Sequence, residues 1–361
     1  MMMKNLEEVC MLSLIINPGS TSTKAAIYKD QEQLCIENIR HTSEELAVFE
    51  KPIDQLDFRK NLVLGFLEKN NVALTDLDCI MSRGGPAPNV RSGATKIGDA
   101  LIEALIERPV DAHISFIGPI IARDIAKEAG IPAFMYDPIT VDELSPLAKM
   151  FGVKGIEHQS IGHVLNTRAT GMAAAKELGK KFDEVTFIVV HIGGGNSVML
   201  WKKGRLVDTI PADMGTFTAE RCGNIRTGYA VKMCQEYGFD QMKSWLGGKG
   251  GFVSLLGTNE LIKVEEMIVA GNEEALKAQQ AMAYQLSRNI CSLLPMTEGE
   301  LDGVVFTGGG AYWQRLMDDM KKWLSVLNTN IYIKPGENEM QALADGAFRV
   351  MTGEEQANEY V

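Results

Sequence analysis

"LIINPGSTSTK", residues 14–24, opens like a buried strand and then turns polar. A Pro-Gly break follows the apolar run, four hydroxyl residues follow the break, and the apolar pattern resumes at Ala25. This order predicts a hairpin whose turn is rich in hydroxyl and backbone N–H donors. Such a turn can hold phosphate oxygens, although the same residue types are also common in ordinary hairpins.

Two later bends have the same character. "HIGGGNS", residues 191–197, lies between two apolar runs, and "FTGGGAYW", residues 306–313, joins a strand to a helix that we expect from Tyr312. Glycines let the backbone approach a ligand closely, and the first amides of a helix favour anions. The third bend is not a Walker A loop, because no Gly-Lys-Ser/Thr follows it. Three such bends together indicate a phosphate-binding protein more strongly than any one of them.

Strand-like runs alternate with helical patterns along the chain, which predicts an α/β fold. The first two strand–turn–strand units begin about 175 residues apart, and this separation suggests two related halves. We expect one domain from residues 12–165 with 341–361 and a second from residues 166–340. The helix from about Met340 is expected to return to the first domain.

Composition limits the classes of partner. The 361 residues carry a net charge of −11 without a dense Lys/Arg cluster, which argues against a nucleic-acid partner. The six cysteines form neither a C-x-x-C pair nor a zinc-like spacing, so we expect reduced thiols. No apolar run approaches the roughly 20 residues that cross a membrane, and the first residues lack a signal-peptide pattern. We therefore expect a cytoplasmic protein with no membrane partner.

The motifs taken in order resemble those of butyrate kinases, in the acetate kinase family, which belongs to the superfamily of actin, sugar kinases and heat-shock chaperones. They are "LIINPGSTSTK", "SRGGP", "YDP", "HIGGGNS", "FTGGGAY" and "PGENEMQALADGAFRV". The resemblance covers residues 12–355, nearly the whole chain. The last motif and the short chain favour butyrate kinase over acetate kinase.

The resemblance implies a two-domain actin-like ATPase fold, built from a duplicated ribonuclease H-like βββαβαβα unit with a five-stranded sheet in each domain. The nucleotide would lie in the interdomain cleft. The implied reaction is reversible in-line transfer of a phosphoryl group from ATP to butyrate, with Mg²⁺, giving ADP and an acyl phosphate. A carboxylate is already a nucleophile at neutral pH, so the protein needs cations and neutral donors more than a base. A homodimer or a higher homo-oligomer is expected by analogy alone.

The resemblance also suggests catalytic residues. Arg83 in "SRGGP" would meet the substrate carboxylate and the transferring phosphoryl group, as a planar guanidinium can. His163 would stabilise that phosphoryl group, and His113 would be a further active-site histidine. The second arginine is preferably Arg221, while Arg226 stays open as the alternative.

For Mg²⁺, the resemblance indicates Asp137 in "YDP" and Glu339, with Glu337 as the alternative to the latter. His191 is expected to position the second bend. The residues expected to bind the nucleotide are Asn17, Ser20, Thr21, Ser22, Lys24, His191, Gly193, Gly194, Gly195, Asn196, Gly308, Gly309 and Gly310.

The sequence is also compatible with other functions. Acetate kinases carry Phe-His where this chain has Gly162-His163, so we hypothesise a wider acyl pocket. An acetate, propionate or branched-chain carboxylate kinase is the nearest alternative, because one methylene changes selectivity by only about 1–3 kcal/mol. A sugar kinase would use an aspartate such as Asp137 as a base. A non-catalytic ATP-driven module would need an extra interaction segment, which the sequence does not indicate.

Overall fold

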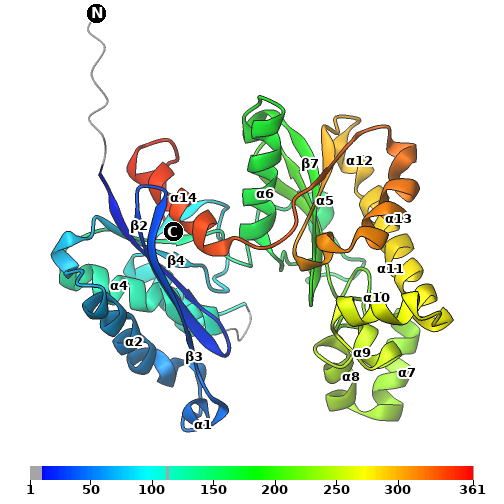
Figure 1. The fold of residues 1–361 in the computed structure, drawn as a ribbon, viewed down its shortest axis with the longest axis horizontal. Coiled ribbons are helices and arrows are strands. Elements are labelled where there is room, and N and C mark those ends of the chain that lie inside the picture. The colour runs from blue at the N-terminus through cyan, green and yellow to red at the C-terminus, as the bar shows by residue number, and fades with distance from the viewer. Residues whose placement is uncertain (1–9, 111–113, 361) are drawn as a thin grey trace, which may run out of the picture. The chain divides into compact units, whose positions relative to one another are not determined.

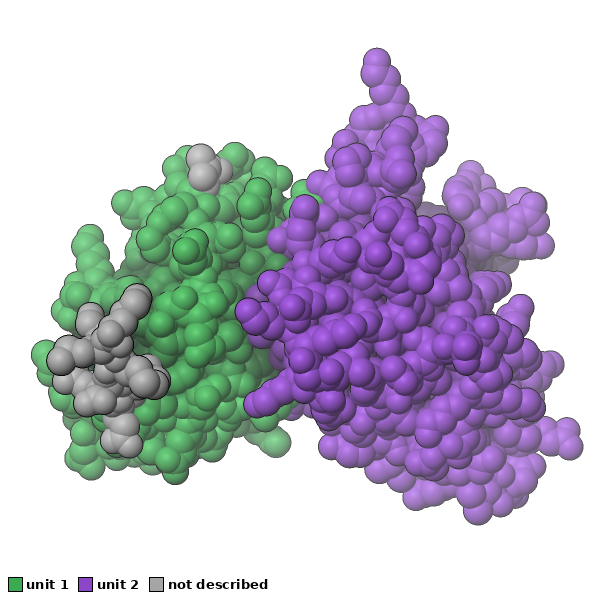
Figure 2. All heavy atoms as spheres, turned by 90° about the horizontal axis from the view of Figure 1, so that it is seen from above, with its two compact units in different colours: residues 1–142, 338–361 green, residues 143–337 purple. Residues whose placement is uncertain are grey.

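The structure, a computed structural model, describes residues 10–110 and 114–360. The chain divides into two compact units, coloured separately in Figure 2. Unit 1 consists of residues 1–142 and 338–361, and unit 2 consists of residues 143–337. The two domains expected from the sequence, residues 12–165 with 341–361 and residues 166–340, stay a prediction.

Six strands form the sheet of unit 1 within the described residues, in the order β3-β2-β1-β4-β6-β5. Strands β1 and β2 form the expected antiparallel hairpin, and β1, β4 and β6 run parallel. The prediction of five strands was wrong here, because the chain after Gly93 adds a short strand antiparallel to β6. The strands are β1 (Leu12–Pro18), β2 (Ser22–Lys29), β3 (Glu32–Arg40), β4 (Cys79–Arg83), β5 (Ala94–Lys96) and β6 (Ala133–Tyr136).

Helices lie against both faces of this sheet (Figure 1). Alternate residues of a strand point to opposite faces, so Leu14 and Ile16 share one core with α2 and α4. Asn17 lies on the other face, where α14 packs on β1 and β4. The helices of unit 1 are α1 (Ser43–Leu46), α2 (Leu56–Lys69), α3 (Asp99–Glu107), α4 (Ile117–Ala129) and α14 (Glu339–Met351).

The sheet of unit 2 repeats this plan. Its described strands have the order β11-β10-β7-β8-β9, in which β7 and β8 form a hairpin and β7, β10 and β11 run parallel. The central order therefore matches that of unit 1, as expected for a duplicated unit. The strands are β7 (Thr186–Ile192), β8 (Asn196–Lys202), β9 (Arg205–Pro211), β10 (Gly303–Thr307) and β11 (Asn330–Ile333).

The core of unit 2 lies between one face of its sheet and the helices that follow β9. Ile188 and Val190 join this core together with residues of α11 and α13, whereas α6 packs against β7 and β10. The helices are α5 (Pro146–Lys149), α6 (Val164–Glu177), α7 (Thr227–Tyr237), α8 (Phe239–Leu246), α9 (Gly251–Leu256), α10 (Leu261–Val269), α11 (Glu273–Ser292), α12 (Leu294–Thr297) and α13 (Gln314–Leu324).

The third bend differs from the prediction in detail. Residues Gly309–Tyr312 form a 3-10 turn, and α13 begins at Gln314 instead of Tyr312. The glycines therefore lie in a tight turn before the helix and do not form its first turn.

Two further expectations concern the whole chain. No helix among the described residues is both long and apolar enough to cross a bilayer. All six cysteines are free thiols, as expected. Burial raises the pKa of the Cys79 thiol to about 12, so this thiol is unreactive at neutral pH.

Candidate active site

The first bend joins β1 to β2 in unit 1. Its ends are tied by a hydrogen bond of 2.8 Å from the Gly19 amide to the Ser22 carbonyl. Ser20 and Thr21 are exposed at the tip, while Lys24 lies opposite Asn17 in the strand register. The turn thus presents the Ser20 and Thr21 hydroxyl groups to solvent, with the half-buried Lys24 nearby.

Arg83 ends β4 and lies beside two residues of the predicted site. Its Nη1 is 2.8 Å from Glu339 Oε1, and Asn17 Nδ2 donates to Glu339 Oε2 at 2.8 Å. The Arg83 and Glu339 side chains are 21% and 16% exposed, so the ion pair is only partly screened by water. Strands β1 and β4 and helix α14 therefore bring one cation, one anion and one amide together in unit 1.

Asp137 follows β6 at the same edge of the sheet, since Arg83 and Tyr136 are register partners. Its carboxylate is buried and accepts a hydrogen bond of 2.6 Å from the Gly93 amide. The backbone at Asp137 has a φ of 39°, an uncommon conformation outside glycine. A strained, buried carboxylate at the carboxyl ends of parallel strands is a reasonable candidate for a functional group.

The glycines of "SRGGP" have a packing role. A Cβ at Gly84 would lie 2.5 Å from Pro138 Cα, and one at Gly85 would lie 2.5 Å from Phe116 Cα. Only glycine lets the backbone come this close to Pro138 and to Phe116, so the two glycines fix the loop that follows Arg83.

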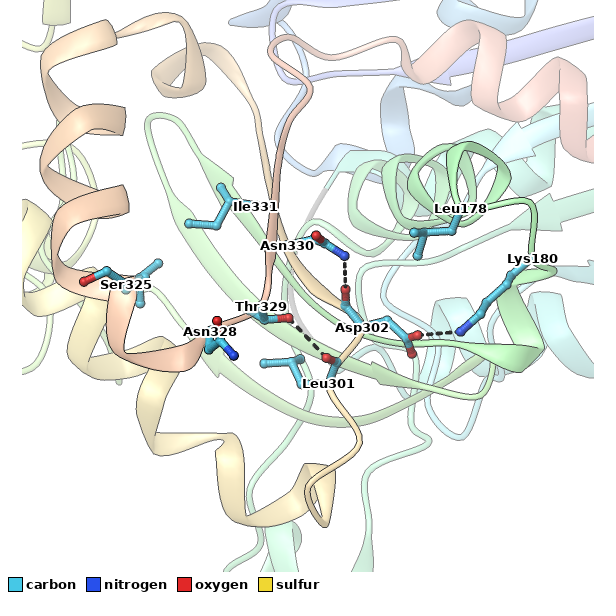
Figure 3. Close-up of a pocket in the computed structure, with 10 residues that line it drawn as sticks. Leu178, Lys180, Leu301, Asp302, Ser325, Asn328, Thr329, Asn330 and Ile331 are labelled. Carbon is cyan, nitrogen blue, oxygen red and sulfur yellow. Dashed lines mark hydrogen bonds and ion pairs between the residues drawn. The ribbon is translucent and has the colours of Figure 1, made fainter.

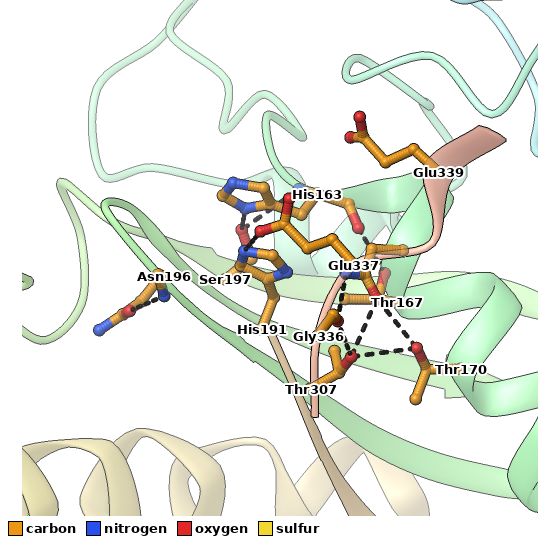
Figure 4. Close-up of polar contacts among 12 residues, drawn as sticks. His163, Thr167, Thr170, His191, Asn196, Ser197, Thr307, Gly336, Glu337 and Glu339 are labelled. Atoms are coloured by element: carbon orange, nitrogen blue, oxygen red, sulfur yellow. Dashed lines mark hydrogen bonds and ion pairs between the residues drawn. The ribbon is translucent and has the colours of Figure 1, made fainter. Parts of the chain in front are cut away.

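Two of the predicted histidines form a stacked pair in unit 2 (Figure 4). The rings of His163 and His191 are parallel within 7°, with centroids 3.8 Å apart. His163 precedes α6, and its Nδ1 lies 2.9 Å from the Ser197 hydroxyl of β8, which also accepts from the His163 amide at 3.3 Å. The sequence-predicted His113 lies outside the described residues.

Glu337 contacts the buried member of this pair. Its Oε1 is 3.2 Å from His191 Nε2, and His191 is 1% exposed. The preceding carbonyl of Gly336 is held by Asn166 Nδ2 at 3.3 Å and Thr307 Oγ1 at 3.2 Å. Glu337 therefore belongs to unit 2, whereas Glu339, two residues later, is bound by groups of unit 1.

The second and third bends lie side by side in unit 2. A Cβ at Gly308 would lie 2.4 Å from the Ile192 carbonyl oxygen, and one at Gly310 would lie 2.3 Å from Ile192 Cγ2. Gly308 also has a φ of 83°, which favours glycine. Within the second bend, the Gly193 amide donates to Asn196 Oδ1 at 3.3 Å. These two bends thus form one glycine-rich edge at the carboxyl ends of β7 and β10.

The two candidate arginines have different surroundings. A Cβ at Gly195 would lie 3.0 Å from Arg221 Cζ, so this guanidinium lies beside the second bend. Arg226 instead stacks over the Tyr229 ring of α7, 5.5 Å from its centroid. Of the two arginines, Arg221 is the one beside a bend predicted to bind phosphate, and its active-site role stays a prediction.

A hollow of about 640 Å³ lies at the opposite end of the unit 2 sheet (Figure 3). It is lined by the chain after α6, by the residues before β10, and by the segment from the end of α13 to the start of β11. Several of its polar groups pair with each other: Lys180 Nζ is 2.7 Å from Asp302 Oδ1, and Thr329 Oγ1 donates to the Leu301 carbonyl. Ligands of open α/β sheets bind at the carboxyl ends of the strands, so this hollow is not the candidate site.

The carboxylates of Asp137 and Glu339 are suitable ligands for Mg²⁺, but they do not form a complete metal site by themselves. Within residues 10–110 and 114–360, no three His, Cys, Asp or Glu side chains cluster as a metal site would. Mg²⁺ commonly takes one or two carboxylates together with waters and substrate phosphates. Asp137 and Glu339 could serve in this way, directly or through water.

Comparison with known proteins agrees with this fold. A model of the acetokinase family matches residues 149–347, just over half of the 361 residues. The acetate kinase of Porphyromonas gingivalis superposes with a TM-score of 0.75 at 16% identity, covering 93% of this chain and 99% of that one. The fold is thus that of the actin-like ATPases, in the form found in acetate kinases.

Two further solved structures are similar. A propionate kinase from Francisella tularensis has a TM-score of 0.75, and the acetate kinase of Entamoeba histolytica has 0.77. Each is 16% identical and covers 93% of this chain, which covers 98% of the other. At this identity the superpositions show a shared fold and leave the substrate open.

Proposed function

Because this chain belongs to the acetokinase family, whose members are carboxylate kinases that use ATP and a divalent metal, we propose that it phosphorylates a short-chain carboxylate and that butyrate is its preferred acid. ATP would donate the phosphoryl group directly in line, and the reaction would be reversible. The products are ADP and butanoyl phosphate.

The observation that carries this proposal is the pairing of Arg83 with a carboxylate. The guanidinium at the end of β4 lies 2.8 Å from a carboxylate oxygen of Glu339. A substrate carboxylate has the same chemistry and could take a place at this cation. Phosphoryl transfer to an anion needs such a group, because the reacting oxygens repel each other.

We assign the other residues to roles that this chemistry requires. His163, oriented by Ser197, would donate a hydrogen bond to the transferring phosphoryl group. Arg221 would add positive charge beside the second bend. The amides and hydroxyls of the three bends would hold the nucleotide phosphates. Mg²⁺ would neutralise phosphate charge, with Asp137 and Glu339 as its protein-side acids.

Preference for butyrate is the finer part of the proposal. It rests on the "PGENEMQALA" motif and on Gly162 in place of a large ring. A Cβ at Gly162 would lie 2.5 Å from Met199 Cε and 2.7 Å from Ser197 Oγ. A Gly162→Phe variant would therefore disturb the Ser197 contact of His163 as well as any acyl pocket. Substrate comparison in the native protein is the cleaner test.

The test is a hydroxamate assay for acyl phosphate with ATP, Mg²⁺ and acetate, propionate, butyrate, isobutyrate or valerate. We expect the highest kcat/KM with butyrate and measurable use of its neighbours, since one methylene gives only about a 10–200-fold preference. If kcat/KM is highest with acetate or propionate, the preference for butyrate is rejected, but the protein is still a carboxylate kinase. Absence of product with every acid would reject the enzyme assignment.

A further inference from the structure

Arg59 lies beneath the first bend and is completely buried. It is in the first turn of α2, and its side chain is 0% exposed. A buried charge is costly unless it is well paired. Within the described part of the chain, the hydrogen bonds of Arg59 run to neutral groups. This arrangement needs a reason beyond the packing of the helix.

The acceptors of Arg59 are mainly carbonyl groups of the bend itself. Nη1 donates to the Gly19 oxygen at 2.8 Å and to the Ser22 oxygen at 2.9 Å. Nη2 donates to the Ser20 oxygen at 3.2 Å. One planar guanidinium therefore binds three carbonyls within four consecutive residues.

These contacts fix the direction of the neighbouring amides. In a trans peptide the C=O and N–H bonds point in opposite directions. Because the Gly19 and Ser20 carbonyls point toward Arg59, the N–H groups of Ser20 and Thr21 point away from it. Both residues are exposed, and among the described residues neither amide donates to a backbone acceptor. Successive N–H groups on one side of a turn form a concavity that suits an anion.

We propose that Arg59 is a positioning residue for phosphate binding: it holds the carbonyls of the first bend inward so that the Ser20 and Thr21 amides face phosphate oxygens of ATP. This role rests on the proposed function for the identity of the ligand. Arg59 does not touch the reacting atoms and acts through the bend.

The charge of Arg59 assists the same purpose. Burial lowers the pKa of its guanidinium to about 10, which still leaves the side chain protonated at neutral pH. Among residues 10–110 and 114–360, Arg59 has no carboxylate partner, so its charge contributes a positive potential behind the bend. A polyanion in front of the bend gains from this potential.

The experiment compares Arg59→Met and Arg59→Lys with Val63→Ala. Val63 is one turn further along α2 and fully buried, so this control weakens the packing of the same helix without touching the bend. The readouts are kcat, the KM values for ATP and for the carboxylate, the calorimetric Kd for Mg-ATP, and hydrogen exchange of residues 17–24.

We expect both Arg59 variants to raise the KM and Kd for ATP by about tenfold or more, because well-placed hydrogen bonds to a charged ligand are lost. Lysine keeps the charge but does not reproduce the planar fork that reaches three carbonyls. The KM for the carboxylate should stay near the wild-type value, and residues 17–24 should lose protection by ATP. Val63→Ala should lower the melting temperature while leaving ATP affinity unchanged.

Several results would overturn the proposal. The first comparison uses conditions in which both variants are folded. If Arg59→Met then binds ATP within twofold of the affinity of Val63→Ala, Arg59 is a purely structural residue. If Arg59→Lys binds ATP with wild-type affinity, the planar guanidinium does not position the bend, and the proposal is rejected. This comparison decides the question if Arg59→Met fails to fold. A wild-type protein that binds ATP but phosphorylates no acid would refute the proposed function, while the comparison of ATP affinities would still test Arg59.

Discussion

Arg83 and Glu339 form an ion pair of 2.8 Å, although β4 and α14 come from distant parts of the chain. Asn17 holds the second oxygen of the same carboxylate. Arg83, which we propose binds the substrate carboxylate, is therefore already paired with the carboxylate of Glu339. When a substrate carboxylate binds, Glu339 must either share Arg83 with it or move away. The pair places a candidate substrate-binding group next to a candidate metal-side acid.

Arg83→Ala should lower kcat about 10²–10³-fold, because it removes a preorganised cation from the transferring phosphoryl group. ATP affinity should change little, since the bends are intact. Arg123→Ala is the matched control: Arg123 is a partly exposed arginine of the same unit, paired with Asp124 at 2.8 Å. Steady-state kinetics and calorimetry with ATP measure both effects. Wild-type kcat in Arg83→Ala would remove Arg83 from the mechanism.

Glu339→Gln and Glu337→Gln should separate the two candidate metal-side acids. We expect Glu339→Gln to raise the Mg²⁺ concentration for half-maximal rate about 10–100-fold, the usual effect of losing an oriented group around a metal. Glu337 pairs with His191 instead, so Glu337→Gln should leave the Mg²⁺ requirement unchanged. Titration of activity with Mg²⁺ at saturating ATP decides the matter. The reverse pattern would transfer the role to Glu337.

Ser197→Ala should lower kcat by about threefold to tenfold, the value of one lost hydrogen bond, because Ser197 fixes the ring of His163. Ser197→Thr keeps a hydroxyl and should restore most of the rate. In a His163→Ala background the serine substitution should have almost no further effect, since the two residues act together. Additive losses in the double variant would show that Ser197 acts elsewhere.

The sequence predicted the hairpins that carry the first two bends, but it did not predict the residue that supports the first bend. Repeated apolar runs broken by Gly, Ser and Asn were enough to place the β1–β2 and β7–β8 hairpins and to indicate duplication. Arg59 gave no such signal, because an arginine near the start of an amphipathic helix normally faces solvent. Only the approach of α2 to the first bend, which depends on tertiary packing, buries it.

The acids of "PGENEM" show a second limit. Their spacing left Glu337 and Glu339 open, since two acids in one short loop look equivalent in sequence. In the structure the division between the units falls between Glu337 and Asn338, so each acid meets different partners. Short β5 was missed for a related reason: three residues carry too little periodicity to indicate a strand.

Arg221→Ala should lower kcat at least tenfold, whereas Arg226→Ala should leave it near the wild-type value. The guanidinium of Arg221 lies beside Gly195, where phosphate charge is expected, and that of Arg226 lies on Tyr229. Loss of a charged hydrogen-bond donor next to a phosphate typically costs about 1.5–3 kcal/mol. Parallel kinetics on the two variants test this, and a larger loss in Arg226→Ala would reverse the assignment.

His41 should make unit 1 less stable in mild acid. Thr23 Oγ1 accepts from Arg59 Nη1 at 3.1 Å and lies 2.9 Å from His41 Nε2, to which the hydroxyl can donate when that nitrogen is unprotonated. Burial and the Arg59 charge lower the pKa of His41 below 6.5, with Glu45 opposing them. The unfolded chain therefore binds more protons than the folded protein, and stability is lost as the pH falls through 6.5.

His41→Gln removes this titration and should flatten the fall of the melting temperature between pH 7 and pH 5. Val63→Ala carries no change in titratable groups, so it should lower the melting temperature by a similar amount at both pH values. Thermal unfolding followed by circular dichroism at several pH values gives both comparisons. If His41→Gln loses as much stability on acidification as the wild type, another group causes the loss. Titration of His41 then does not explain the acid sensitivity of unit 1.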